Sequence, residues 1–285
     1  MMIGTIRLKG MSQKLKYLSR IRDEFDSVIC GINGVFMYGD KVDLESVQTL
    51  IKLYQSGKRI VLASNSPLRV EDMYYTLKRR NVPMNIFHAM ITAGEIAHFY
   101  LKSRNELGRA YYDLSGNSKI ADGLQYEKAD SIVMADFILA QSDYNGIDEN
   151  KIMPILEQAL YLKLPMLCIG NNTSLVGTDG VVSGAGAIAE RYAMMGGKQV
   201  MPFGKPDVRV AAYLTESLPG FSKERCLLIG DCMSTDIRMA NNFGVKSLLI
   251  TNGVHQMGAD TEQKLDELSG SYGLNIDYYT EALRW

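Results

Sequence analysis

The chain has 285 residues, of which 46% are hydrophobic and 22% are charged, as is ordinary for a soluble globular protein. Its 31 basic and 32 acidic residues leave a net charge of -1, so no electrostatic footprint favours nucleic acid or an anionic membrane. No stretch approaches the ~18 uninterrupted apolar residues of a membrane span, and residues 1–10 lack the apolar core of a signal peptide. We therefore expect a cytoplasmic protein.

Short apolar runs alternate with helical patterns along the chain, which predicts an α/β fold with a parallel sheet and helices on both faces. The first predicted strand covers 27–32, followed by a helix at 43–55, a strand at 59–63 and a helix that begins at Ser66–Pro67. Near the C-terminus the unit repeats, with strands at 225–229 and 245–251 on either side of a helix at 235–242.

The middle of the chain has a smaller α/β pattern of its own. Strands are predicted at 110–113, 137–140 and 166–169, and a helix at 149–162. The segments that carry chemistry lie on both sides of this region, so we interpret it as an insertion. The predicted organisation is a core domain of residues 1–106 and 181–285, with an inserted cap domain at 107–180.

Two segments carry residues suited to binding phosphate. Ser64 and Asn65 follow a buried strand at the start of the predicted helix, where free backbone N–H groups and the helix dipole favour an anion. Lys205 lies between Gly204 and Pro206, in a tight turn that can hold its ammonium group near a phosphate. Taken alone, these patterns are also compatible with an ordinary helix cap and a surface lysine.

A third segment, residues 228–237, follows another buried strand and contains Asp231 and Asp236. Two carboxylates on such a turn are suited to a hard cation, and Mg²⁺ is typically held by one or two carboxylates together with substrate phosphate. Taken alone, the pattern is equally compatible with a turn residue followed by a charge early in a helix.

In this order, the three segments resemble motifs II, III and IV of the haloacid dehalogenase (HAD) superfamily. The resemblance runs from about residue 26 onward, and the insertion between motifs II and III is similar to that of subclass IIA, which includes pyridoxal, phosphoglycolate and aryl-phosphate phosphatases. It implies a HAD-like, doubly wound, Rossmann-like parallel sheet with an inserted α/β cap of the C2 type. The site that it implies binds phosphate through Ser64, Asn65 and Lys205, and Mg²⁺ through Asp231, Asp236 and Asn33.

The first motif of this family, Asp-x-Asp-Gly-Val, is altered here. Residues 31–35 read Gly-Ile-Asn-Gly-Val, so Gly31 stands at the position of the nucleophile and Asn33 at that of the general acid and base. Glycine can neither attack phosphorus nor bind a metal through a side chain, and an amide cannot exchange a proton at neutral pH. Cys30 is expected to face the core, because neighbouring strand residues point to opposite faces, and Cys232 is a weak alternative nucleophile.

A further departure lies in the predicted cap, where Gly170-Asn171-Asn172 stands in place of the Asn-Pro-Asp that subclass members often carry. Two hypotheses follow. The first is a phosphatase-like protein that lacks turnover, keeps a pocket for a phosphorylated metabolite or inorganic phosphate, and binds Mg²⁺ weakly. The alternative is a low-activity, Mg²⁺-dependent hydrolase of a small phosphate ester that uses activated water. Caps of this subclass often contribute to dimers, so the resemblance also raises a homodimer as a hypothesis.

Overall fold

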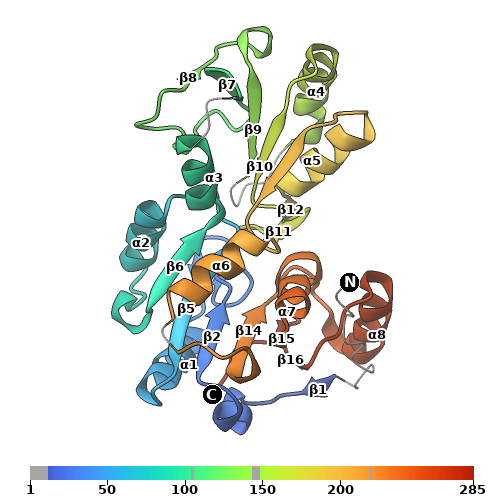
Figure 1. Ribbon diagram of the computed structural model, residues 1–285. Coiled ribbons are helices and arrows are strands. Elements are labelled where there is room, and N and C mark those ends of the chain that lie inside the picture. Colours follow the sequence, from blue (N-terminus) through green and yellow to red (C-terminus); the bar gives the residue numbers. More distant parts are fainter. Residues whose placement is uncertain (1–11, 104–105, 143–147, 219) are drawn as a thin grey trace, which may run out of the picture.

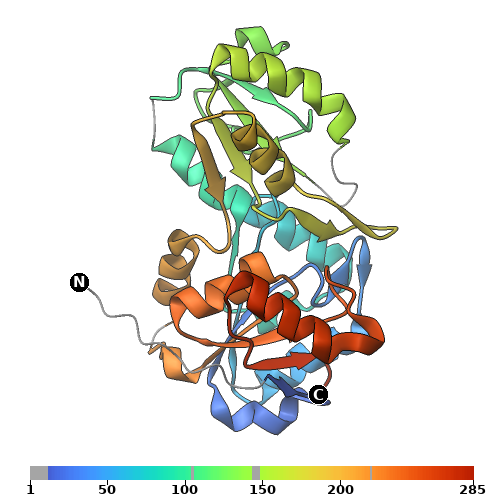
Figure 2. The same ribbon diagram turned by 90° about the vertical axis from the view of Figure 1, so that its right-hand side faces the viewer.

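The structure is a computed structural model, and it describes residues 12–103, 106–142, 148–218 and 220–285. Its strands form two main sheets, which lie one above the other with the cap at the top (Figures 1 and 2). Two short antiparallel pairs complete the strands: β3 (Met37–Tyr38) with β4 (Lys41–Val42), and β11 (Ser174–Val176) with β12 (Val181–Ser183). The short helical turns are η1 (Leu18–Glu24), η2 (Met84–Ile86), η3 (Ile132–Met134), η4 (Lys223–Arg225), η5 (Met233–Ile237) and η6 (Gly258–Asp260).

The lower unit is built on a seven-stranded sheet in which every neighbouring pair of strands is parallel. In spatial order its strands are β1 (Gln13–Lys14), β16 (Tyr278–Thr280), β15 (Lys246–Ile250), β14 (Cys226–Gly230), β2 (Ser27–Cys30), β5 (Arg59–Ser64) and β6 (Ala89–Thr92). The predicted strands at 27–32, 59–63, 225–229 and 245–251 are all present, with ends shifted by one or two residues.

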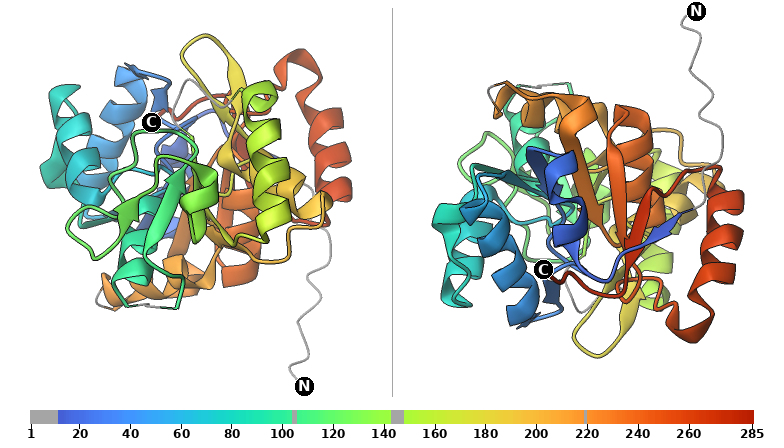
Figure 3. Two further views of the ribbon diagram at one scale, coloured as in Figure 1. Left: turned by 90° about the horizontal axis from the view of Figure 1, so that it is seen from above. Right: turned by 90° about the horizontal axis from the view of Figure 1, so that it is seen from below.

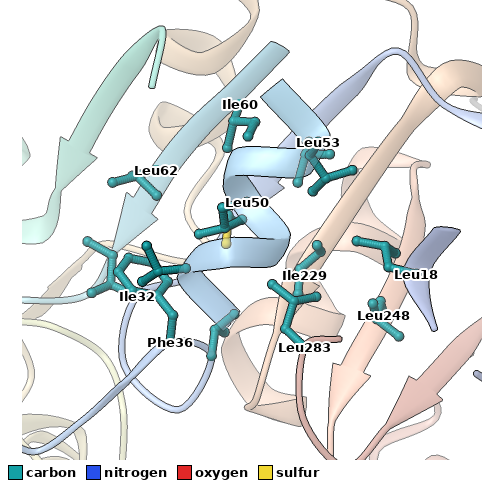
Figure 4. Packing of buried hydrophobic residues seen from close by; sticks show 14 of the residues in the cluster. Leu18, Ile32, Phe36, Leu50, Leu53, Ile60, Leu62, Ile229, Leu248 and Leu283 are labelled. Carbon is teal, nitrogen blue, oxygen red and sulfur yellow. The ribbon is translucent and has the colours of Figure 1, made fainter. Parts of the chain in front are cut away.

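Helices cover both faces of this sheet: α1 (Leu44–Gln55), α2 (Val70–Arg79), α6 (Val208–Glu216), α7 (Arg238–Phe243) and α8 (Thr261–Tyr272). Alternate strand residues face opposite sides, so that Val28 packs toward α1 and α2 while Ile29 packs toward α6 and α7. Figure 4 shows Leu50 and Leu53 of α1 over the first of these faces. Seen from below, α1 and α2 lie on one side and α8 on the other (Figure 3).

The upper unit is built on a second parallel sheet of five strands, ordered β13 (Val200–Phe203), β10 (Met166–Ile169), β9 (Phe137–Gln141), β7 (Ala110–Asp113) and β8 (Glu127–Lys128). Its outer face is covered by α4 (Glu149–Leu162) and α5 (Ala185–Met194), whose apolar residues Leu156 and Ile188 pack on Ile138 and Met166. The predicted strands at 110–113 and 166–169 and the predicted helix at 149–162 have the predicted bounds.

This second unit continues past residue 180, which was predicted to end the insertion. The strand β13 pairs in parallel register with β10, and α5 packs on the same sheet, so residues up to Phe203 contribute to it. The antiparallel β11–β12 pair separates these residues in sequence from the rest of the cap.

The helix α3 (Ala93–Lys102) joins the two units. Its residues Ile96 and Leu101 belong to an apolar cluster that contains Val61 of the core sheet together with Leu167 of the cap sheet. The carboxyl ends of the core strands are thereby held against the cap. Among the residues that the structure describes, no helix has the length and apolar character needed to span a membrane.

Candidate functional site

A cavity of about 130 Å³ lies where the loops after the core strands meet the cap. The residues after β2, β5 and β14 reach it from the core, and the residues after β13 reach it from the edge of the cap sheet. Of the seven positions that the family resemblance assigns to the site, six line the cavity: Asn33, Ser64, Asn65, Lys205, Asp231 and Asp236. Gly31 directly follows β2 and is not one of the lining residues.

Asp231, at the end of β14, is held tightly by backbone on two sides. Gly34 has a φ of +71°, and a Cβ there would lie 1.9 Å from Asp231 Oδ2, while a Cβ on Gly253 would lie 2.3 Å from the Asp231 Cβ. The backbone N–H of Val254 donates to Asp231 Oδ2 at 2.9 Å. Burial, with a smaller contribution from the charge of Asp236, raises the pKa of Asp231 to about 7. Because a Cβ on Gly34 or on Gly253 would clash with the Asp231 side chain, glycine is required at both positions.

Asp236 lies in η5, one turn beyond Asp231, and forms a buried ion pair with Lys205. Lys205 Nζ donates to Asp236 Oδ1 at 2.6 Å, and the two side chains are only 7% and 4% exposed. The other carboxylate oxygen of Asp236 accepts the backbone N–H of Cys232 at 3.2 Å. A Cβ on Gly230 would lie 2.1 Å from Asp236 Cγ, so glycine at the end of β14 makes room for this side chain.

The side chain of Asn65 bonds to other parts of the protein. Its Oδ1 accepts the backbone N–H of Lys205 at 2.6 Å, and its Nδ2 donates to the Lys205 carbonyl at 3.1 Å and to Asn172 Oδ1 at 2.6 Å. Both side-chain N–H groups and the carbonyl oxygen are thus in use. The sequence pattern predicts Asn65 as a direct phosphate ligand, whereas these contacts make its side chain a clamp that positions Lys205.

Ser64 ends β5 and is 6% exposed, and its hydroxyl oxygen accepts the backbone N–H of Ser66 at 3.1 Å. The Ser66 hydroxyl in turn accepts the N–H of Leu68 at 3.2 Å. These two local turns hold residues 64–68 as a loop along the cavity, and α2 begins only at Val70. The prediction that the helix begins at Ser66–Pro67 is therefore wrong, and the N-terminus of α2 does not follow Ser64 directly.

Comparison with known proteins agrees with this arrangement of strands and loops. Residues 202–271 match the sequence family described as HAD-hydrolase-like. A solved HAD-like hydrolase from Brucella suis 1330 superposes with a TM-score of 0.78 at 22% identity, covering 94% of this chain and 99% of that one. The fold is that of the HAD-like hydrolases.

Two phosphatases are similar in sequence to this chain. A chloroplastic phosphoglycolate phosphatase of Arabidopsis thaliana is 25% identical over 271 residues, which is 85% of this chain and 73% of that protein. A glycerol-3-phosphate phosphatase of Gallus gallus is 23% identical over 289 residues, covering 90% of this chain and 89% of that protein. The relatives thus act on small phosphate esters, as their names state.

Two cysteines that were considered as alternative nucleophiles are buried. Cys30 is fully buried in the apolar cluster beneath α1 and α2, as predicted from strand alternation, and burial raises the pKa of its thiol. Burial also raises the pKa of Cys232, whose sulfur lies 3.3 Å from the Ser234 hydroxyl. Neither thiol is placed to form a reactive thiolate at neutral pH.

The three histidines each have a backbone partner. His88 Nδ1 accepts the N–H of Ile60 at 3.2 Å, and His98 Nδ1 lies 2.8 Å from the carbonyl oxygen of Ile120. His255 Nε2 accepts the N–H of Met233 at 3.1 Å. None of these contacts pairs a histidine with a side-chain nucleophile.

The residues that line the cavity offer few ligands for a metal ion. Within the described residues, no group of three or more His, Cys, Asp or Glu side chains is arranged to hold a metal ion. Asp236 is bound to Lys205, so Asp231 is the carboxylate that remains, beside oxygen atoms of Asn33. These are hard ligands that suit Mg²⁺, but they complete a site only if the ligand supplies further oxygen atoms.

Asn172 is a further residue of the site, in addition to the positions that the family motifs indicate. It lines the cavity from the cap, and its amide oxygen accepts a hydrogen bond from Asn65 across the boundary between the units. The replacement of the Asn-Pro-Asp pattern by Gly170-Asn171-Asn172 was the available signal. Gly170 has a φ of +85°, and a Cβ there would lie 2.2 Å from the carbonyl oxygen of Asn65, so this glycine permits the close approach.

Proposed function

We propose that this chain binds a phosphorylated small molecule at the cavity and does not hydrolyse it through a phosphoaspartyl intermediate. One observation supports this most strongly. Ser64 and Lys205 line the cavity together with Asp231, while the residue that follows β2, where the family resemblance expects the nucleophile, is Gly31. The anion-binding groups are thus present in a site without the attacking carboxylate.

Hydrolysis through a phosphoaspartyl intermediate is lost because Gly31 and Asn33 replace the two aspartates of the family's first motif. Gly31 has no side chain, and the amide of Asn33 cannot carry a proton between leaving group and water at neutral pH. Removing the nucleophile of a catalytic unit costs on the order of 10⁶ in turnover. From a typical rate of ~10 s⁻¹, about one turnover per day would remain.

The anion site consists of two donors. The Ser64 hydroxyl accepts from the backbone of Ser66 and keeps its own proton for a ligand oxygen, and Lys205 Nζ offers two further N–H groups beyond the one given to Asp236. Asp231 opposes a phosphate when it is ionised, because two negative charges then share one small cavity and repel each other. Binding is therefore expected to be modest in the absence of a cation.

HAD phosphatases generally use Mg²⁺, and the residues present are compatible with a ligand-assisted ion. Asp231 and Asn33 would hold it with phosphate oxygens, and it would supply positive charge that offsets the Asp231 carboxylate and the phosphate. We infer that Mg²⁺ binds weakly to the free protein and more tightly together with the ligand. Homodimerisation and a cytoplasmic location stay predictions of the sequence analysis.

The test compares the parent protein with the Gly31→Asp/Asn33→Asp variant. A Cβ on Gly31 would lie 3.1 Å from Val35 Cγ2 and 3.3 Å from the Ile229 carbonyl oxygen, so an aspartate there requires both neighbours to move by a few tenths of an ångström. We expect no Mg²⁺-dependent hydrolysis of 4-nitrophenyl phosphate by the parent, hydrolysis by the double variant, and binding of inorganic phosphate to the parent by calorimetry. The Ser64→Ala variant should weaken that binding.

Metal-dependent turnover by the parent would overturn this proposal and favour a second function, hydrolysis by activated water. The observation that favours it is a buried carboxyl group at the cavity, Asp231, whose pKa of about 7 suits a general base. In that case Asp231→Asn would abolish the turnover. Absence of both turnover and phosphate binding would refute both functions.

A further inference from the structure

A second and larger cavity opens beside the phosphate cavity. Its volume is about 600 Å³, and Pro67, Leu68 and Ser142 line both cavities. The volume lies within the roughly 300–1,000 Å³ that is usual for small-molecule sites. A molecule anchored at Ser64 and Lys205 can therefore extend past Pro67 and Leu68 into this space, which we call the cap cavity.

The topology of the cap sheet places this cavity at a switch point. From β7 the chain continues to β8, toward one edge of the sheet, and from the adjacent strand β9 it continues to β10, toward the opposite edge (Figure 1). Ligands in open parallel sheets bind beyond the carboxyl ends of such neighbouring strands. Asp113 ends β7 and Gln141 ends β9, and residues from both ends line the cap cavity.

The polar groups at this end of the sheet are fixed by one another. Ser115 Oγ donates to the buried carboxylate of Asp113 at 2.7 Å and accepts from Gln141 Nε2 at 2.8 Å. Gln141 Oε1 accepts from Ser118 Oγ at 3.0 Å, so the buried amide is held in one orientation. Its second N–H has no partner among the described residues. The hydroxyl of the adjacent Ser142 accepts the N–H of Ala185 at 3.0 Å and keeps its proton for a ligand.

The charged side chains of the cap cavity are paired with one another or with neighbouring residues. Lys119 lies 3.7 Å from Asp72, Lys151 lies 3.2 Å from Asp148, and Arg69 forms a bidentate ion pair with Glu95 at 2.8 and 2.9 Å. No aromatic side chain of the described residues lines the cavity, so no ring surface is available for stacking. The wall thus favours a neutral group that carries several hydroxyls over a second anion or an aromatic ring.

We propose that the cap cavity binds the sugar or sugar-alcohol part of a phosphate ester. This inference rests on the proposed function, because the phosphate of the same molecule lies at Ser64 and Lys205. The fixed amide of Gln141 and the side chain of Asn117, which also lines the cavity, bind the hydroxyl groups. The ligand is then a larger and more polar ester than phosphoglycolate or glycerol phosphate.

Calorimetry on the whole chain tests this with four probes: inorganic phosphate, phosphoglycolate, glucose 6-phosphate and 4-nitrophenyl phosphate. We expect glucose 6-phosphate to bind at least about tenfold more tightly than the other three, since one well-made set of hydrogen bonds to a neutral group is worth about a factor of ten. The variants Gln141→Met and Asn117→Ala should each reduce this ratio. The matched control Gln48→Met, on the exposed side of α1, should preserve it.

The outcomes separate this inference from the proposed function. Equal affinities for the phosphate esters and inorganic phosphate, or tighter binding of 4-nitrophenyl phosphate, would overturn the sugar assignment while the phosphate site stands. A preference that survives both cap variants would place the sugar elsewhere and also overturn it. Absence of binding by all four probes would refute the proposed function and this inference together. Because Asn117 is an exposed loop residue, its variant keeps the test valid if Gln141→Met unfolds.

Discussion

Lys205 and Asp236 form an ion pair in which both charges are almost removed from water. Desolvation makes each charge costly unless it is paired, so neither side chain is tolerable alone in this position. With glycine at position 31, no side chain there competes for the Lys205 ammonium group, which donates a hydrogen bond to Asp236 Oδ1 at 2.6 Å. The pair therefore fixes the one cation that the phosphate cavity presents among the described residues.

Replacing Lys205 by methionine should destabilise the fold strongly, because it leaves the Asp236 carboxylate buried and unpaired. We expect a loss of roughly 3–5 kcal/mol in the free energy of unfolding, measured by urea denaturation at neutral pH. The Lys205→Met/Asp236→Asn double variant removes both charges and should recover much of that loss. Equal destabilisation of the single and double variants would show that the ion pair contributes nothing specific.

At the scale of elements, the turn η5 brings Asp236 back toward Asp231 and is held from outside by His255. The imidazole accepts the N–H of Met233, the first residue of this turn, and burial lowers the pKa of His255, although the charge of Asp236 opposes the shift. The neutral ring is therefore the form that stabilises η5, because a protonated ring has no acceptor to offer.

This contact gives the fold a defined pH dependence. In the unfolded chain His255 titrates near 6.5, whereas the folded protein binds the proton only at lower pH. Its contribution to stability is thus complete above about pH 6.5 and is lost as the pH falls from there toward the folded pKa. In His255→Gln, urea unfolding at pH 7.5, 6.5 and 5.5 should show a shallower loss of stability than in the parent. Parallel pH profiles would contradict this assignment.

The elements themselves were largely predictable from sequence, because buried strands and amphipathic helices leave periodic patterns. The strands at 110–113 and 166–169 and the helix at 149–162 were predicted to the residue. The start of α2 was not, since the hydroxyls of Ser64 and Ser66 bond to the local backbone and delay the helix. The role of Asn65 also depends on a contact with Lys205, 140 positions away, which no local pattern contains.

At the scale of the whole molecule, the cap and core meet at the phosphate cavity through side chains as well as through α3. Asn65 of the core donates to Asn172 of the cap at 2.6 Å, and the same Asn65 holds the backbone of Lys205 in two hydrogen bonds. The residue that links the two units is therefore also the residue that positions the cation. This arrangement couples the placement of the cap to the shape of the anion site.

Two substitutions separate these roles. Asn65→Ala removes the link to the cap and the clamp on Lys205, so we expect it to cost about 1–3 kcal/mol of stability and to weaken phosphate binding by more than tenfold. Asn172→Ala removes the link alone, and should cost about 0.5–1.5 kcal/mol with a smaller loss of affinity. Urea denaturation and phosphate calorimetry on both variants measure the two effects. If Asn172→Ala weakened phosphate binding as much as Asn65→Ala, the link to the cap rather than the clamp on Lys205 would control the anion site.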